Sequence, residues 1–113
     1  MEIIKERQRI RHNNSQTCSA FEYPSREPKI NGAVTRVKGR YPLRGWVMNK
    51  KCTELVYILR GSGTITVEGK RSAFAKGDMI VIPPGEKYFW RATSTMFVAA
   101  TPAWYPEQHE AVD

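Results

Sequence analysis

The chain has 113 residues, enough for one small domain, and its 41% hydrophobic and 26% charged residues are ordinary for a globular protein. No apolar run approaches the ~20 residues that a membrane-spanning helix needs, and the charged first residues lack the apolar core of a secretory signal. We therefore expect a cytoplasmic protein with no membrane contact. The cysteines, Cys18 and Cys52, are far apart and have no zinc-binding spacing, so we expect free thiols.

The net charge of +7 is unevenly distributed along the chain. The basic residues are concentrated between Arg26 and Lys51, where Glu27 is the only acid, whereas the charged residues after Ala103 are acidic. A basic segment attracts nucleic acid, anionic ligands or an acidic protein surface, but a solvated strand face has the same composition. No nucleic-acid-binding motif accompanies the charge, so we do not expect a nucleic-acid partner.

The first third of the chain is polar and poorly patterned. Residues 1–15 predict an arm that is either mobile or adds an edge strand. Residues 24–32 hold two prolines and a glycine and predict a loop. We therefore assign residues 1–32 to an N-terminal arm and loop, and residues 33–113 to a barrel with a C-terminal tail, all in one domain.

From residue 33 onward almost the whole chain predicts short strands. Residues 33–40 alternate small or apolar side chains with basic ones, which is typical of a half-buried strand. Gly61 and Gly63 are expected to form a tight hairpin through positive φ angles. Other β-branched and aromatic runs follow, punctuated by glycine, proline or polar residues, at residues 54–60, 64–68, 72–75, 79–83, 87–91 and 96–101. This pattern predicts an all-β sandwich or barrel.

Two stretches of the chain resemble the motifs of a known family. Residues 45–61 resemble the first cupin motif, which runs from a glycine through two histidines and a glutamate to a closing glycine; Glu54 and Gly61 fall in register. Residues 77–88 resemble the second motif, a glycine followed by Pro-x-Gly and a histidine. The chain thus resembles a small single-domain protein of the cupin superfamily, of the RmlC-like type. The resemblance implies an all-β double-stranded β-helix, the cupin jelly-roll barrel, and a homodimer.

The positions that bind metal in this family hold other residues here. Metal-binding cupins resemble one another in using two histidines and a glutamate from the first motif and a histidine from the second, ligands suited to transition metals. The corresponding positions hold Met48, Lys50 and Tyr88, and only Glu54 is kept. A lysine ammonium cannot coordinate until it loses its proton, and it repels a divalent cation at close range. We therefore expect no metal and no other cofactor.

A different set of side chains is expected to line the pocket. Lys50, Cys52 and Glu54 share one strand parity, as do Tyr88 and Trp90, so unbroken strands place each set on one face, although a β-bulge would break this inference. We predict that these five residues bind a ligand: the amine neutralises an anion, the carboxylate and phenol bond hydroxyl groups, and the indole stacks. Alternatively, Lys50 and Glu54 form a structural ion pair, Cys52 is a small buried hydrophobe, and both aromatics belong to the core.

The terminal segments hold four more residues of interest. His12 and His109 lie outside both motifs, and surface positions are expected for them. Trp104 and Tyr105 need apolar cover, which predicts that the C-terminal stretch either caps the barrel mouth or packs across a dimer interface.

Three functional hypotheses follow. The first is a metal-free pocket that binds a small polar ligand of the sugar or carboxylate type. The second is a metal-independent sugar isomerase, epimerase or lyase, with Glu54 as base and Tyr88 or Lys50 as acid, although the chain offers few general bases. The third is a structural or regulatory interaction domain whose basic face binds an acidic partner. Whether the chain is an enzyme stays open at this point.

Overall fold

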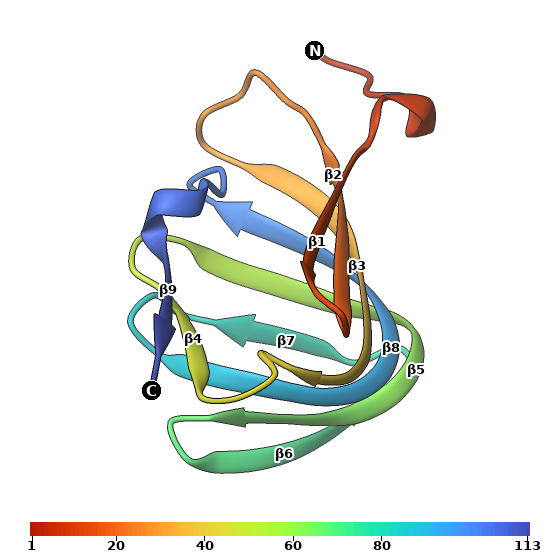
Figure 1. The fold of residues 1–113 in the computed structure, drawn as a ribbon. Helices are drawn as coiled ribbons and strands as arrows, with labels where there is room; N and C mark the ends of the chain where they lie inside the picture. The colour runs from red at the N-terminus through yellow and green to blue at the C-terminus, as the bar shows by residue number, and fades with distance from the viewer.

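The computed structural model describes all 113 residues, and its nine strands form one strongly curled antiparallel sheet (Figure 1). The two helical segments are single 3-10 turns, η1 (Glu6–Gln8) and η2 (Pro106–Gln108), and no helix has the length and hydropathy to cross a membrane. The expected all-β architecture is confirmed. The strands are β1 (Ile10–Ser15), β2 (Cys18–Tyr23), β3 (Asn31–Tyr41), β4 (Trp46–Asn49), β5 (Thr53–Val67), β6 (Lys70–Ala75), β7 (Met79–Ile82), β8 (Lys87–Thr101) and β9 (His109–Val112).

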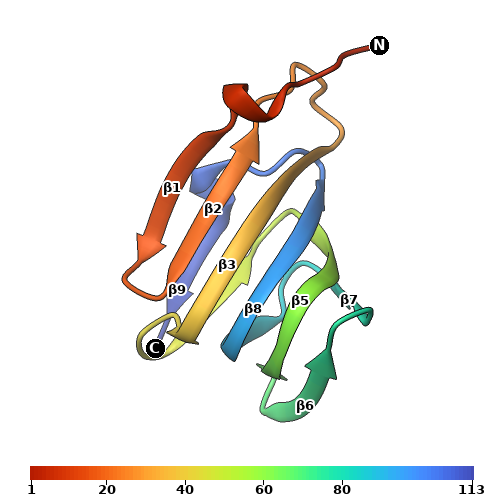
Figure 2. The ribbon, with the colours of Figure 1, turned by 90° about the vertical axis from the view of Figure 1, so that its right-hand side faces the viewer.

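Two long, bent strands, β5 and β8, hold the sheet together. They pair with each other along most of their length, and β3 pairs with the other edge of β8. β7 and β6 pair with successive parts of β5, while β4 pairs with the start of β8 and carries β9 on its far side. Figure 2 shows β2, β3, β8 and β5 side by side. Because both long strands bend, the sheet curls around a core that includes Val56, Ile58, Ile82 and Met96.

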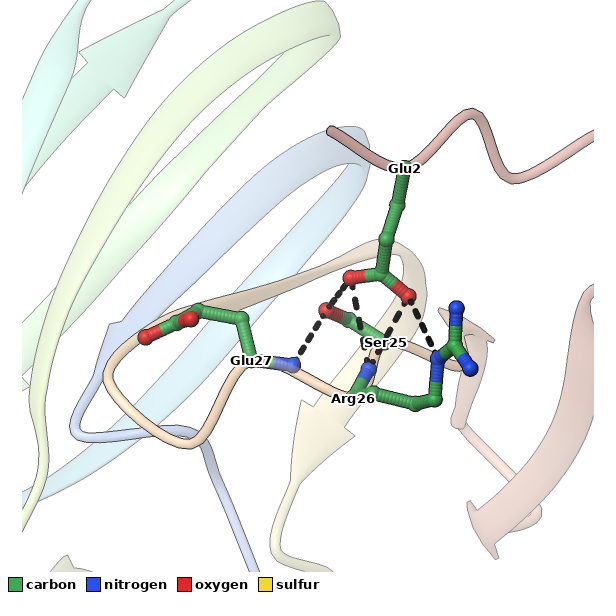
Figure 3. A network of polar contacts seen from close by, with 4 residues as sticks. All are labelled: Glu2, Ser25, Arg26 and Glu27. Carbon is green, nitrogen blue, oxygen red and sulfur yellow. Dashed lines mark hydrogen bonds and ion pairs between the residues drawn. The ribbon is translucent and has the colours of Figure 1, made fainter.

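Residues 1–32 are part of this sheet. β1 and β2 form a hairpin, and β2 pairs with β3, so the edge-strand alternative for residues 1–15 is the one that the structure shows. Glu2 ties the N-terminus to the loop after β2 (Figure 3). Its carboxylate accepts hydrogen bonds from the Ser25 hydroxyl and from the backbone N–H of Arg26, and the same hydroxyl accepts one from the backbone N–H of Glu27. The hairpin is therefore anchored at its open end.

The prediction of a hairpin turn at Gly61-Ser62-Gly63 is wrong. β5 runs through these residues without a break, with a bulge between Ile58 and Arg60, and the turn comes later, at Glu68 and Gly69, which both have positive φ. In the same way, the two strands predicted at 87–91 and 96–101 form one strand, β8. The glycine signal was read as a turn, although here it marks a bend in a continuous strand.

Gly61 and Gly63 are needed because β5 and β8 approach each other closely at that bend. A Cβ atom on Gly61 would lie 2.0 Å from the carbonyl oxygen of Thr93, and one on Gly63 would lie 2.5 Å from that of Arg91. Gly61 also has a φ of 84°, which favours glycine. The two glycines thus permit the close contact of backbones on which the curl depends.

We predict that Gly61→Ala destabilises the protein by about 3 kcal/mol or more, because a backbone clash is added to the ~1–2 kcal/mol strain of a left-handed residue. Gly77→Ala is the matched control: Gly77 has a φ of 93° but no atom within 4 Å of its added Cβ, so only the strain of about 1–2 kcal/mol applies. Urea unfolding measures both. Equal losses for the two variants would contradict the close-approach explanation.

Candidate functional site

The concave face of the sheet encloses a cavity of about 690 Å³. This is within the ~300–1,000 Å³ usual for small-molecule sites. Its walls come from β1, β2, β3, β5, β8 and the segment that precedes β9, and they are apolar over much of their area, with Cys18, Val37, Val56, Met96 and Val98 among the lining residues. The interior is therefore not filled by packed side chains. Both the binding and the enzyme hypotheses require such an open space.

Glu54 and Tyr88 form a hydrogen-bonded pair in the cavity wall. They lie on the paired strands β5 and β8, and the Tyr88 hydroxyl donates to Glu54 Oε1 over 3.1 Å. Burial raises the pKa of the Glu54 carboxyl, and the hydrogen bond from Tyr88 and the nearby Asn49 amide partly oppose that rise. Burial also raises the pKa of Tyr88, so its phenol stays a neutral donor. The pair supplies an oriented carboxyl group in a largely apolar chamber.

Trp90 forms part of the same wall. Its ring packs edge to face against Phe74, with centroids 5.4 Å apart, and against Tyr88 at 6.3 Å. These contacts fix the ring, which is 5% exposed and lines the cavity. The structure thus brings Glu54, Tyr88 and Trp90 together.

Lys50 and Cys52 do not line the cavity. The Lys50 side chain is exposed and makes no ion pair with Glu54. Cys52 is fully buried, and its thiol donates to the carbonyl oxygen of Pro102 over 3.2 Å, which matches the alternative of a small buried residue. Both cysteines are free.

Lys50 does not share a face with Glu54 because the strand is interrupted between them. β4 ends at Asn49 and β5 begins at Thr53, so the residues between them bend instead of continuing one strand. Within β4 the buried side chains are Val47 and Asn49, not Met48. The alternation of buried and exposed side chains counted back from Glu54 therefore does not hold at residue 49. There the buried side chain is that of Asn49.

The C-terminal segment brings His109 into the cavity wall, although a surface position was expected for it. β9 pairs with β4, which sets His109 opposite Asn49. His109 Nδ1 lies 2.9 Å from Asn49 Oδ1, and its Nε2 lies 3.4 Å from the Tyr41 hydroxyl. The Trp104 ring packs against the imidazole, with ring centroids 5.6 Å apart. Burial lowers the pKa of His109. Of the two alternatives for the C-terminal aromatics, the structure favours the cap, because Trp104 and Tyr105 line the cavity.

The N-terminal hairpin adds polar groups that sequence reasoning missed because the segment was treated as an arm. His12 and Glu22 both line the cavity, with His12 Nε2 4.0 Å from Glu22 Oε2. Asn14 donates to the Cys18 sulfur over 3.7 Å, and burial raises the pKa of that thiol to about 11, so it stays protonated. Figure 1 shows this hairpin and β9 on opposite sides of the curled sheet.

The side chains present do not fit the transition-metal site of metal-binding cupins. No three His, Cys, Asp or Glu side chains are grouped so that they could hold an ion. Glu54 is the one motif ligand in the cavity, and it is engaged by a neutral phenol. The two histidine positions of the first motif hold Met48 and Lys50, whose side chains do not line the cavity.

Comparisons with known proteins agree with this architecture. The model of the EutQ-like cupin domain family matches residues 44–99, which include both motif-like stretches. No curated protein matches the chain in sequence.

Several solved structures share the fold at low sequence identity. Pac13 from Streptomyces, solved as a variant with uridine, has a TM-score of 0.89 at 15% identity and covers 100% of this chain and 92% of its own. Another Pac13 structure, described as a unique nucleoside dehydratase, has a TM-score of 0.88 at 15% identity over 99% and 91% of the two chains. Ectoine synthase from P. lautus has a TM-score of 0.68 at 19% identity over 88% and 79%. At these identities the similarity shows the fold.

We predict that Glu54→Gln raises the melting temperature by a few degrees at pH 8. The amide keeps an oxygen for Tyr88, and it removes a carboxyl whose folded-state pKa is raised, so that ionisation costs stability. That cost is absent below the unfolded pKa of about 4.3 and grows as the pH rises through the folded value. The gain should therefore vanish near pH 4.

Thermal unfolding followed by circular dichroism across this pH range measures the effect, with Glu110→Gln on the exposed face of β9 as the control. A Glu54→Gln variant that is less stable than the wild type at pH 8 would show that the ionised carboxylate is stabilised in the folded state.

Proposed function

This chain belongs to the cupin superfamily, and from that premise we propose that it binds a small polar ligand rich in hydroxyl groups, of the sugar or nucleoside type, without the metal used by metal-binding cupins. The observation that carries the proposal is the cavity of about 690 Å³, with its apolar walls and its buried carboxyl–phenol pair. Apolar walls with a few converging polar groups are the usual form of a small-molecule site.

The polar groups of the cavity favour hydroxyls over carboxylates as the ligand's recognised groups. Glu54 has one oxygen bonded to Tyr88 and a second that can accept from a ligand hydroxyl. Lys50, which was expected to neutralise an anionic ligand, lies outside. Arg11 is the one lysine or arginine in the lining, and its guanidinium lies over the Phe21 ring, which does not line the cavity. An anionic ligand would therefore meet the buried Glu54 carboxyl, whereas a hydroxyl group would find an acceptor.

A nucleoside combines ribose hydroxyls with a flat base, and the cavity offers matching surfaces. The lining includes the aromatic residues Trp90 and Trp104 and the polar residues Glu54 and His109. The structure of Streptomyces Pac13 with uridine has the same fold over the whole of this chain, which supports uridine as the first ligand to test.

A metal-independent lyase or isomerase is the second candidate. It is supported by Glu54, whose raised pKa suits a carboxylic acid that can give a proton, and by His109 in the same cavity. The chain thus has a second titratable group for acid–base chemistry, which the motif positions alone did not provide.

The cytoplasmic location and the homodimer remain predictions. For the dimer we propose that the outer face of the sheet pairs with its copy. One apolar side chain from each of five neighbouring strands forms a row there, in mutual register: Phe21, Val34, Phe97, Tyr57 and Met79. Met79 is 60% exposed and Tyr57 44%, so a second copy would give this end of the row the apolar cover that it lacks in the monomer. At the other end, guanidinium groups already lie over the Phe21 ring. The oligomeric state in solution tests this proposal.

We predict that the wild-type chain binds uridine with a dissociation constant on the order of 0.1 mM, from about 0.3 kcal/mol for each non-hydrogen atom of a drug-sized ligand. Thr35→Trp should abolish binding, because Thr35 lines the cavity and the indole would occupy it. Arg36→Trp is the matched control on the same strand, since Arg36 does not line the cavity and should leave binding unchanged. Isothermal calorimetry measures all three.

Lys50→Met adds a second control. An unchanged affinity for uridine agrees with the exposed position of Lys50. A strong loss of affinity would show that Lys50 contacts the ligand, as the sequence predicted. If uridine, other nucleosides and hexoses all fail to bind the wild-type chain, the proposed ligand class is wrong. Equal binding by the two tryptophan variants would place the ligand outside the cavity.

A further inference from the structure

A chain of buried amide groups leads from the backbone to the imidazole of His109. Its first member is Gln108, which is 1% exposed. Gln108 Oε1 accepts hydrogen bonds from the backbone N–H groups of Lys51 and Cys52, at 3.2 and 3.1 Å. Because backbone N–H groups can only donate, the orientation of this amide is fixed, and its Nε2 must be the atom that faces Asn49.

The orientation of Asn49 follows from that of Gln108. Gln108 Nε2 donates to Asn49 Oδ1 over 2.8 Å, so the Asn49 oxygen is the atom on this side of the amide. The same oxygen lies 2.9 Å from His109 Nδ1. Since a carbonyl oxygen can only accept, His109 Nδ1 must carry the hydrogen, and in the neutral ring Nε2 is then an unprotonated acceptor.

The unprotonated ring nitrogen belongs to a residue of the cavity wall. Both His109 and Tyr41, whose hydroxyl is 3.4 Å from His109 Nε2, line the cavity. That distance is long for a hydrogen bond between a hydroxyl and a ring nitrogen, so the contact leaves Nε2 weakly satisfied. Burial lowers the pKa of His109, which keeps the ring neutral, and Trp104 packs against its face.

Asn49 also connects this histidine to the other polar group of the cavity. Its Nδ2 is buried and has no partner within ordinary hydrogen-bonding geometry, yet Asn49 is one of the two groups that lower the pKa of Glu54. Asn49 thus connects the two polar groups: its amide oxygen lies 2.9 Å from His109 Nδ1, and its amide lies close enough to Glu54 to lower the pKa of that carboxyl.

We propose that His109 Nε2 is a hydrogen-bond acceptor for a hydroxyl group of the bound ligand, and that Asn49 and Gln108 are positioning residues that lock the histidine in its Nδ1–H tautomer. This inference rests on the proposed function, because it specifies how a ligand rich in hydroxyls is read. His109 would thus recognise the ligand in addition to Glu54 and Tyr88, the two motif residues in the cavity. It comes from the C-terminal end of the chain, whereas the β1–β2 hairpin in the cavity wall comes from the N-terminal end. The same lone pair is the atom that would take a proton if the bound ligand reacts.

The tautomer is tested directly by long-range ¹H–¹⁵N correlation spectra of the His109 ring in the full chain. The wild type should show a protonated Nδ1 and an unprotonated Nε2. Asn49→Leu removes the acceptor and should shift the ring toward the Nε2–H tautomer, whereas Asn49→Asp keeps an acceptor oxygen and should retain Nδ1–H. A wild-type ring that is protonated on Nε2 overturns the inference, and so does a tautomer that is the same in all three proteins.

The hydroxyl contact is tested by calorimetry with uridine and its 2′-, 3′- and 5′-deoxy forms. In the wild type the deoxy form that lacks the hydroxyl bound by His109 should bind about 3–10-fold more weakly than uridine, the usual loss for one hydrogen bond, and a second form should lose a similar factor where its missing hydroxyl is the one bound by Glu54. His109→Phe keeps an aromatic ring against Trp104 but has no acceptor, so this discrimination should disappear while the other two deoxy forms behave as before. Thermal unfolding of the variant checks that it is folded.

The outcomes separate the two proposals. Discrimination that survives unchanged in a folded His109→Phe variant refutes the His109 contact and leaves the ligand class intact. If no nucleoside binds the wild-type chain, the proposed ligand is wrong and the hydroxyl contact falls with it. An Nδ1–H tautomer together with lost discrimination in the variant supports the whole inference.

Discussion

The close pairing of β5 with β8 is the constraint on which the rest of the structure depends. The two strands are paired from Thr53↔Thr101 to Val67↔Tyr88. At the bend the backbone of β8 lies so close to Gly61 and Gly63 that neither position has room for a β-carbon. A sheet that bends there encloses space on its concave side, and the same ladder sets Glu54 and Tyr88 into that space. The fold and the candidate site therefore have one physical cause, the approach of two backbones that only glycine allows.

The two ends of the chain contribute to the walls of the cavity, and this explains how a barrel without the usual ligands still organises polar groups. The N-terminal hairpin contributes His12 and Glu22, and the C-terminal segment contributes Trp104 and His109. Buried polar groups are costly unless they are bonded, and Gln108 meets that requirement with two backbone donors. The ordered network that results fixes the imidazole without any ionic partner.

The sequence predicted much of the fold and about half of the candidate site, and the errors have a common origin. Glycine and proline spacing revealed the strands, and the motif resemblance identified the family and the pair Glu54 and Tyr88. Parity arguments failed where a strand stops, so Lys50 was assigned to an interior that Asn49 occupies. His109 lies on a strand of four residues, too short to show a period, and its role depends on pairing with β4 far away in the sequence. Long-range pairing of this kind leaves no local pattern.

The central claim is that a small hydroxyl-rich ligand occupies the cavity between the two chain ends. Backbone amide shifts of the ¹⁵N-labelled chain, followed during a titration with uridine, test it most directly. We expect the residues whose amides shift to cluster around the cavity, at Ala33, Glu54, Tyr88 and His109, while Lys70 and Arg71 on β6, which do not line the cavity, stay unperturbed. Shifts confined to the outer face or to the basic residues between Arg26 and Lys51, or no shifts at millimolar uridine, would contradict it.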